Sequence, residues 1–118
     1  MGSDEQSHIV AVTEIHGIAG RRDELRELMR ETQLRVSQEP GCRRYRFAAS
    51  VEDPDEYLNV QEWASEAAFA DHQRSPAFRE YQSRLFELLA RPSDMRVHRM
   101  SHAVAPQPSG PGDPRSYD

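Results

Sequence analysis

Apolar and polar positions alternate in some stretches of this chain and recur at helical spacing in others. Residues 8–16 (HIVAVTEIH) are rich in β-branched side chains and alternate roughly, which predicts a strand. The same pattern predicts strands at 43–49, 56–63 and 95–104, with a turn around Pro54 between the second and the third. Because successive side chains on a strand point to opposite faces, each strand is expected to turn one side toward a core.

Helical spacing of apolar residues predicts the first helix between the first two strands, over residues 23–38. Acidic residues at its start, Asp23 and Glu24, favour the positive end of a helix dipole. Pro40 and Gly41 are expected to stop the helix before the second strand begins. The charged side chains between the apolar positions predict a helix with one face exposed.

The second helical region follows the third strand and has an internal break. Ser65 is the predicted N-cap of a helix that runs to about Arg74. Ser75 and Pro76 then have the residue types of a new N-cap and first helical position. Pro92 is expected to end this last segment. Its apolar face comprises Phe78, Tyr81, Leu85, Leu88 and Leu89.

The order strand, helix, strand, strand, helix, strand predicts one α+β domain over residues 8–104. Right-handed crossovers close it into a ferredoxin-like βαββαβ fold, a four-stranded antiparallel sheet with both helices on one face. The other face needs cover, and only 36% of the residues are hydrophobic, so we expect a homodimer. Residues 1–7 and the proline-rich stretch 105–118 are expected to be a flexible N-terminus and a disordered tail.

Composition narrows the classes of function. The chain has a formal net charge of −5. It therefore lacks the basic face that phosphate neutralisation requires, and we expect no nucleic-acid partner. Its one cysteine, Cys42, can form neither an internal disulfide nor a thiolate cluster around a metal. No apolar run reaches membrane-spanning length and residues 1–7 lack a signal pattern, so we expect no membrane contact and a cytoplasmic location.

The third strand carries the most unusual face of the chain. Alternation places four side chains together on it: Tyr57, Asn59, Gln61 and Trp63. Such a mixture of amides and aromatic rings suits the wall of a ligand cavity. The alternative is structural, since a tryptophan at a strand end often anchors a core and buried amides are usually satisfied by their neighbours.

His72 follows on the next helix and shares a face with Phe69, three residues earlier. It is a candidate pocket base or haem ligand, but we favour a structural hydrogen bond from His72 to Glu62 that joins helix to strand. The other histidines do not form a metal site by spacing. On a strand, His98 and His102 lie about 13 Å apart, too far for one ion. We expect no metal bound by the protein's own side chains.

Two segments resemble the antibiotic biosynthesis monooxygenase (ABM) family of dimeric α+β barrel proteins. One is EPGCRRYRF at the end of the first helix, and the other is EW followed by SEAAFADH and SPAF. The likeness runs over about residues 8–104. It implies a homodimer whose sheets form a barrel, with a cavity between each sheet and its helices. The likeness is more specific for the fold than for the reaction.

The resemblance also implies roles for particular residues. In the cofactor-free oxygenases of the family, an Asn and a Trp four apart on the third strand take part in oxygenation, and Asn59 and Trp63 match them. Those enzymes carry a Tyr ten residues after the Asn, where this chain has Phe69; His72 or Tyr81 is a candidate replacement. Haem-degrading relatives use a first-strand Asn, a Trp and a helix His. The Trp has a counterpart here, but the first strand contains no Asn.

These observations lead to a hypothesis and two alternatives. The hypothesis is a cofactor-independent monooxygenase that oxidises a phenol, quinol or anthrone with O₂. Asn59 would donate a hydrogen bond to the oxyanion, Trp63 would stack on the substrate, and His72 would accept its proton. Four residues would line the site: Tyr57, Gln61, Phe69 and Tyr81. The alternatives are a haem-binding or haem-degrading protein and a non-catalytic dimeric module that holds a small aromatic ligand.

Overall fold

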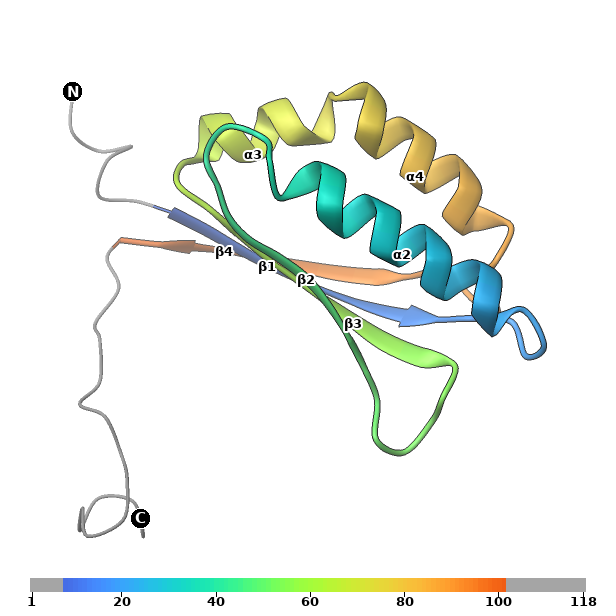
Figure 1. Cartoon of the computed structure of the whole chain (residues 1–118). Coiled ribbons are helices and arrows are strands. Elements are labelled where there is room, and N and C mark those ends of the chain that lie inside the picture. The colour runs from blue at the N-terminus through green and yellow to red at the C-terminus, as the bar shows by residue number, and fades with distance from the viewer. Residues whose placement is uncertain (1–7, 102–118) are drawn as a thin grey trace, which may run out of the picture.

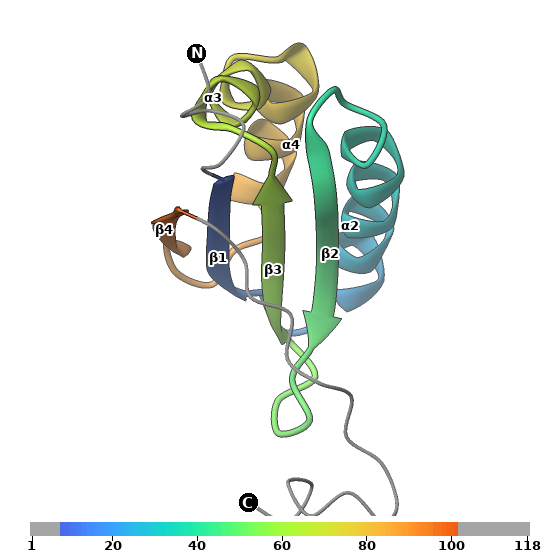
Figure 2. The same ribbon diagram turned by 90° about the vertical axis from the view of Figure 1, so that its left-hand side faces the viewer.

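The sheet and its helices form two layers. The computed structural model describes residues 8–101, and the expected flanks 1–7 and 105–118 lie outside that range. The elements in chain order are β1 (His8–His16), α2 (Arg22–Val36), β2 (Cys42–Ala49), β3 (Glu56–Trp63), α3 (Glu66–Gln73), α4 (Pro76–Phe86) and β4 (Asp94–Met100). The sheet order is β2-β3-β1-β4 with antiparallel neighbours. All helices lie on one side of the sheet (Figures 1 and 2), which confirms the predicted ferredoxin-like fold.

Serine caps fix the break between α3 and α4. The Ser65 hydroxyl accepts a hydrogen bond from the Ala68 amide at 3.1 Å, and the Ser75 hydroxyl accepts one from the Phe78 amide at 3.1 Å. Pro76 follows at the first helical position, where its missing N–H costs nothing. Both predicted N-caps are therefore confirmed, and the turn between them changes the direction of the chain (Figure 1).

Two predicted helix ends differ from the structure. The first helix ends at Val36 rather than near residue 38, although this difference is within the usual uncertainty of helix ends. The last helix ends at Phe86, well before Pro92. Pairing with the end of β1 stops it: the Ala90 amide donates to the His16 carbonyl at 2.8 Å, and Leu89 forms an isolated bridge with Gly17.

Gly41 allows β2 to start directly against α3. Its φ of +81° lies in the left-handed region, which L side chains rarely adopt. A Cβ at this position would lie 2.5 Å from the Cβ of Ala68, so a side chain would also collide with α3. The Gly41 carbonyl accepts a hydrogen bond from the Ala64 amide at 2.8 Å and so ties the start of β2 to the end of β3.

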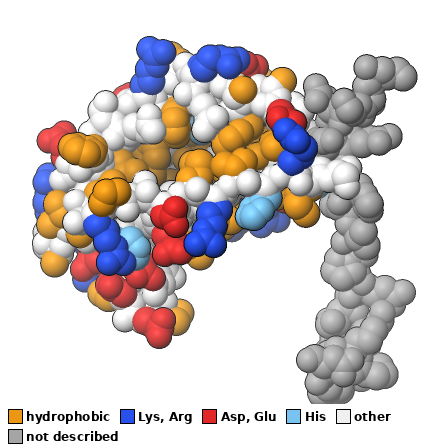
Figure 3. Space-filling view, turned by 180° about the vertical axis from the view of Figure 1, so that it is seen from behind, with side chains coloured by type: hydrophobic (Ala, Val, Ile, Leu, Met, Phe, Trp, Pro, Cys, Tyr) orange, Lys and Arg blue, Asp and Glu red, His pale blue; other side chains and the backbone are white. Residues whose placement is uncertain are grey.

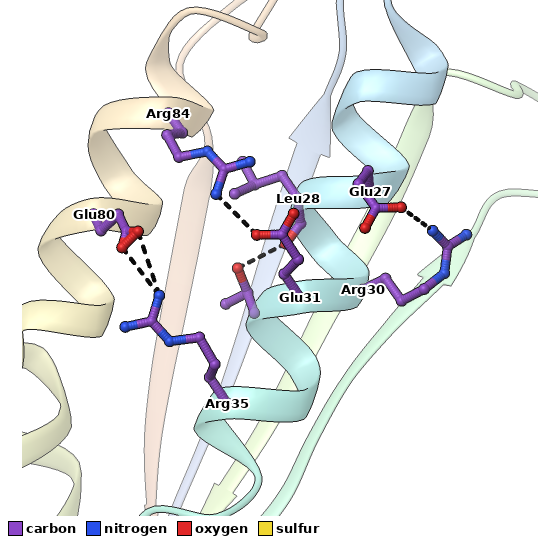
Figure 4. A network of polar contacts seen from close by, with 8 residues as sticks. Glu27, Leu28, Arg30, Glu31, Arg35, Glu80 and Arg84 are labelled. Carbon is purple, nitrogen blue, oxygen red and sulfur yellow. Dashed lines mark hydrogen bonds and ion pairs between the residues drawn. The ribbon is translucent and has the colours of Figure 1, made fainter.

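The core between sheet and helices has two clusters. One contains Ile15, Leu25, Leu28, Met29, Tyr57, Tyr81, Leu85 and Leu88. The other contains Ile9, Ala11, Val36, Tyr45, Trp63 and Phe69. Ion pairs between α2 and α4 lie above the first cluster (Figure 4): Arg84 pairs with Glu31 and Arg35 pairs with Glu80, each at 3.0 Å. Exposed pairs of this kind add little stability, so the apolar clusters hold the layers together.

The opposite face of the sheet has no helix over it. Val12 pairs directly with Val60 at its centre, and Leu58 on the same face is 42% exposed. Arg46, opposite Val60, and Arg96, opposite Val12, lie beside this apolar centre on the flanking strands. An apolar strip bordered by charged residues on a sheet face is typical of an interface.

Candidate functional site

The four-residue face predicted on β3 points toward the helices. Tyr57, Asn59, Gln61 and Trp63 are 3%, 2%, 1% and 0% exposed. The alternation of side chains along β3 therefore predicted correctly that these four residues share one face of the strand. We call Asn59, Gln61 and Trp63 the amide row.

Hydrogen bonds run along the amide row from end to end. The Trp63 Nε1–H donates to Gln61 Oε1 at 2.9 Å, and Gln61 Nε2 donates to Asn59 Oδ1 at 2.8 Å. Asn59 Nδ2 donates to the carbonyl oxygen of Arg46 at 3.1 Å. Trp63 thus uses its one side-chain donor within the row, whereas each amide nitrogen has two N–H groups and uses one of them in these bonds.

The partner of His72 is Glu39, in the loop after α2, so the predicted hydrogen bond to Glu62 is wrong. His72 Nδ1 lies 2.9 Å from Glu39 Oε1. Glu62 pairs with Val10 and Arg44 on the helix-free face and is directed away from His72. Since a carboxylate only accepts, the contact favours the imidazole tautomer with its proton on Nδ1.

The other ring nitrogen of His72 is buried without a partner. The side chain is 1% exposed, and Nε2 has no hydrogen-bond partner among the described residues. Burial lowers the pKa of His72, and this effect outweighs the opposing influence of Glu39. The imidazole is therefore neutral at pH 7, with an unprotonated Nε2 that can accept a proton.

Aromatic rings surround this imidazole. It stacks on the indole of Trp63 with centroids 4.7 Å apart, and the rings of Phe78 and Tyr45 lie at 5.0 and 5.8 Å. Phe69 tilts against Trp63 at 6.4 Å. The structure thus brings together three residues that were assigned to the same candidate site: His72, Trp63 and Phe69.

The remaining predicted lining residues belong to the other core cluster. Tyr81 packs against Phe47, with centroids 6.1 Å apart, and burial raises its pKa. The Tyr57 hydroxyl donates to the Pro54 carbonyl and accepts from Arg26. Burial likewise raises the pKa of Tyr45. Tyr45 and Tyr81 therefore stay protonated near neutral pH and cannot serve as bases there.

Thr13 was not foreseen from the sequence as part of the site. It lies opposite Asn59 on β3 and opposite Met95 on β4, so these three side chains cross the sheet on the helix-facing side. Thr13 is 7% exposed, and its hydroxyl has no hydrogen-bond partner among the described residues. An unsatisfied buried hydroxyl carries a free-energy penalty of about 1–3 kcal/mol, which a ligand could remove.

An apolar hollow opens between the helices and the edge strand β4 (Figure 3). A cavity of about 460 Å³ lies at the end of α4 and along the segment that leads into β4, lined by Phe86, Leu89, Arg91, Pro92 and Ser93. Val97 points to the helix side, opposite buried Ala11, yet is 47% exposed. The hollow therefore leaves this side of β4 open. At a strand spacing of about 4.8 Å, Asn59 lies two strands, or roughly 10 Å, in from Met95.

Two further features are missing from residues 8–101. No group of three or more His, Cys, Asp and Glu side chains in this range could hold a metal ion. Within the same range, no helix has the length and hydropathy to cross a membrane.

Comparison with protein families gives one match. A model of the antibiotic biosynthesis monooxygenase family, ABM, matches residues 8–84. Among curated proteins, an uncharacterised Synechocystis protein, sll1783, is 29% identical over 63 residues, which cover 53% of this chain and 43% of that protein. The matched part thus spans less than half of that relative.

Several solved structures share the fold. A conserved protein from Methanosarcina mazei Go1 has a TM-score of 0.75 at 22% identity, over 80% of this chain and 94% of that one. Rv0793 from Mycobacterium tuberculosis has a TM-score of 0.72 at 24% identity, over 86% and 97%. Protein SO0527 from Shewanella oneidensis has a TM-score of 0.74 at 23% identity, over 80% and 92%. At such identities the likeness establishes the fold alone.

Proposed function

Because this chain belongs to the antibiotic biosynthesis monooxygenase family, we propose that it is a monooxygenase that oxidises a small aromatic substrate with O₂. The substrate is an anthrone, quinol or related phenol, bound between the sheet and the helices. The observation that carries the proposal is the position of His72, whose unpartnered Nε2 is buried beside the amide row.

His72 supplies the base. An anthrone carries a CH₂ group between two rings and loses a proton from it to give a delocalised anion. His72 Nε2 accepts that proton, while Glu39 holds the opposite nitrogen and stabilises the imidazolium that forms.

The anion is electron-rich enough to react with O₂ directly. It transfers one electron to O₂, and the two radicals combine at the deprotonated carbon as a peroxide. Cleavage of the O–O bond, with loss of the second hydrogen from that carbon, leaves a carbonyl. The departing oxygen takes up both the proton held by His72 and the second proton released from the carbon, and leaves as water. The reaction thus balances as one CH₂ group and one O₂ giving one carbonyl and one H₂O.

The amide row stabilises the oxyanion of the deprotonated substrate. Gln61 Nε2 has a second N–H beyond the one bound to Asn59. Asn59 Nδ2 also has a second N–H beyond the one bound to the Arg46 carbonyl, and the substrate would compete for it with the Tyr45 hydroxyl, to which the Asn59 side chain is hydrogen-bonded. Donors held in a buried site stabilise developing charge strongly, because the local dielectric is low. The Trp63 N–H is already bound by Gln61, so Trp63 contributes its ring face rather than a hydrogen bond.

Substrate reaches the amide row from the hollow beside β4. The path passes Met95 and Thr13, and the unsatisfied Thr13 hydroxyl is positioned to bind a polar group of the substrate on the way. Since Asn59 is 2% exposed, binding requires Met95 or α4 to move outward. Strand β4 is the element suited to such a shift, because it is an edge strand with mostly exposed side chains.

A non-catalytic module that holds an aromatic ligand is the second candidate. It is favoured by the closed hydrogen bonds of the amide row, which satisfy Trp63 without any ligand. In that case the ligand would stay in the hollow, and Asn59 would have only a structural role in the core.

Haem, the alternative cofactor, does not fit the surroundings of His72. The rings of Trp63, Phe78 and Tyr45 enclose the imidazole, which is 1% exposed with Nδ1 bound to Glu39. A porphyrin would have to displace these rings, so no step is assigned to haem.

The helix-free face is proposed as the homodimer interface. Its centre of Val12 and Val60 would meet the same residues of a second copy across a two-fold axis. The neighbouring Arg44 and Glu62, which are opposite one another, offer charges of both signs for pairing between copies. This arrangement completes the barrel that the resemblance implies.

The test is oxygen uptake with anthrone, corrected for spontaneous autoxidation. His72→Gln and Thr13→Val should both slow turnover, the first by about a hundredfold because a general base is lost. Arg79→Gln, at an exposed position on α4, is the control and should retain the wild-type rate. Equal rates in all four proteins would contradict the roles assigned to His72 and Thr13. A folded wild-type protein that takes up no oxygen with anthrone would favour the non-catalytic module instead.

A further inference from the structure

A second groove lies on the other side of the molecule from the hollow, between α2 and the β2 edge of the sheet. Its cavity volume is about 260 Å³. The lining residues are Arg26, Met29, Arg30, Gln33, Phe47, Ala49 and Tyr57. Two arginines thus border an apolar floor, and no acidic residue is among the lining residues.

Arg26 differs from the other arginines of α2 because its side chain is not paired with a carboxylate of the described residues. Arg22 pairs with Asp55, Arg30 with Glu27 and Arg35 with Glu80; the last two pairs are visible in Figure 4. The Arg26 Nε instead donates to the Tyr57 hydroxyl at 3.0 Å, and no carboxylate among residues 8–101 lies within ion-pair distance of it. In a chain with 20 acidic and 15 basic residues, a guanidinium bound to a phenol stands out.

Tyr57 fixes this guanidinium in place. Its hydroxyl accepts a hydrogen bond from Arg26 and donates one to the Pro54 carbonyl at 2.9 Å, so the hydroxyl acts as both acceptor and donor. The guanidinium carbon also lies 5.8 Å from the Tyr57 ring centroid, within cation–π range. With Nε held, the terminal nitrogens remain as a planar pair of donors, the arrangement that binds a carboxylate through both oxygens.

The rest of the groove fits an aromatic ring. Met29 is 4% exposed and offers its side chain to the floor beside Phe47 and Ala49. Gln33 Oε1 accepts from the Phe47 amide at 3.0 Å, while its Nε2 keeps its N–H donors. Arg26 is the charged group left to orient a ligand, at one end of an apolar surface.

We infer that this groove binds a small aromatic carboxylate, with its carboxylate on Arg26 and its ring on Met29 and Phe47. The site does not depend on the proposed oxygenase reaction and lies at the opposite edge of the sheet from the hollow. Its volume suits one or two rings. A bare inorganic anion would gain only the contact with Arg26 and would leave the apolar floor in water.

An NMR titration with 1-naphthoate, 1-naphthamide and inorganic phosphate tests the inference. Naphthoate should shift the backbone amide signals of Phe47 and Ala49 and bind at least about tenfold more tightly than the neutral amide or phosphate. Arg26→Met should lose about tenfold in naphthoate affinity, whereas Arg79→Met, the same charge change at an exposed site on α4, should match the wild type.

A second variant separates this groove from other sites. Ala49→Trp fills the groove from an exposed edge-strand position and should abolish the naphthoate shifts while the fold is retained. Equal binding of naphthoate and naphthamide, equal loss in Arg26→Met and Arg79→Met, or unchanged binding to Ala49→Trp would each overturn the inference. None of these results depends on oxygenase activity.

Discussion

The imidazole of His72 lies stacked on the indole of Trp63, with centroids 4.7 Å apart and ring planes inclined by 26°. This contact joins α3 to the end of β3 and places the buried base against the last residue of the amide row. Glu39 completes the arrangement from the loop after α2. A residue 33 positions earlier in the sequence thus meets the consecutive elements β3 and α3 at one titratable group.

The stability of the protein should depend on pH through His72. Burial lowers its folded-state pKa below the ordinary value near 6.5. Between these two pKa values the unfolded chain binds more protons, so the free energy of unfolding rises with pH. The contribution is complete above about pH 6.5 and is lost as the pH falls from there toward the folded-state pKa.

Urea unfolding of wild type and His72→Gln between pH 5.5 and 7.5 measures this dependence. The wild type should lose stability toward the acid end of the range, and the variant should show a shallower slope. Arg79→Gln, at an exposed position on α4, is the control and should follow the wild type. A steep slope that persists in His72→Gln would assign the effect to other groups.

Gln61 should be the most sensitive residue of the amide row. Gln61→Leu keeps most of the volume but leaves Trp63 Nε1 and Asn59 Oδ1 buried without partners. Each unsatisfied group costs about 1–3 kcal/mol, so the free energy of unfolding should fall by about 2–6 kcal/mol. Arg79→Gln, at an exposed position on α4, should change it by less than about 0.5 kcal/mol in the same urea titration. A small effect of Gln61→Leu would mean that the row contributes little to the core.

The helix-free face should control association. Val60→Asp introduces a charge at the centre of the proposed interface and should convert a dimer into a monomer. Light scattering coupled to size exclusion gives the mass directly. Arg79→Asp, on the helix side, should leave the dimer intact. A wild-type monomer, or a Val60→Asp dimer, would contradict this assignment.

Haemin should not bind through His72. The imidazole is enclosed by aromatic rings, so titration with haemin should give no Soret shift that depends on this residue. Comparison of wild type with His72→Gln makes the measurement specific, because surface binding would be the same in both. A one-to-one complex present only in the wild type would replace the oxygenase proposal with the haem alternative.

The fold and one side of the site could be predicted from sequence because they depend on local patterns. Alternation of side chains along β3 was enough to predict that Asn59 and Trp63 share one face. The N-cap residues Ser65 and Ser75 were enough to predict where α3 and α4 begin. The partner of His72 could not be predicted in this way. Glu39 is 33 positions away and approaches only because Gly41 brings the start of β2 against α3.

Thr13 could not be predicted as part of the site, because its position there depends on the register between strands. Thr13 enters the site because it pairs with Asn59, and no pattern within β1 or β3 specifies that pairing. The end of α4 has the same kind of cause. Its apolar spacing continues through Leu88 and Leu89, but pairing with the end of β1 takes these residues out of the helix.

We propose that this protein inserts one atom of O₂ into an aromatic substrate at the amide row. Mass spectrometry of the product formed from anthrone under ¹⁸O₂ tests it most directly, with Asn59→Ala and Arg79→Gln assayed beside the wild type. We predict one heavy oxygen atom in the product carbonyl, formed by wild type and Arg79→Gln well above the autoxidation rate and by Asn59→Ala close to it. Product formation at the autoxidation rate in all three folded proteins, or carbonyl oxygen derived from labelled water without exchange of the finished product, would contradict the account.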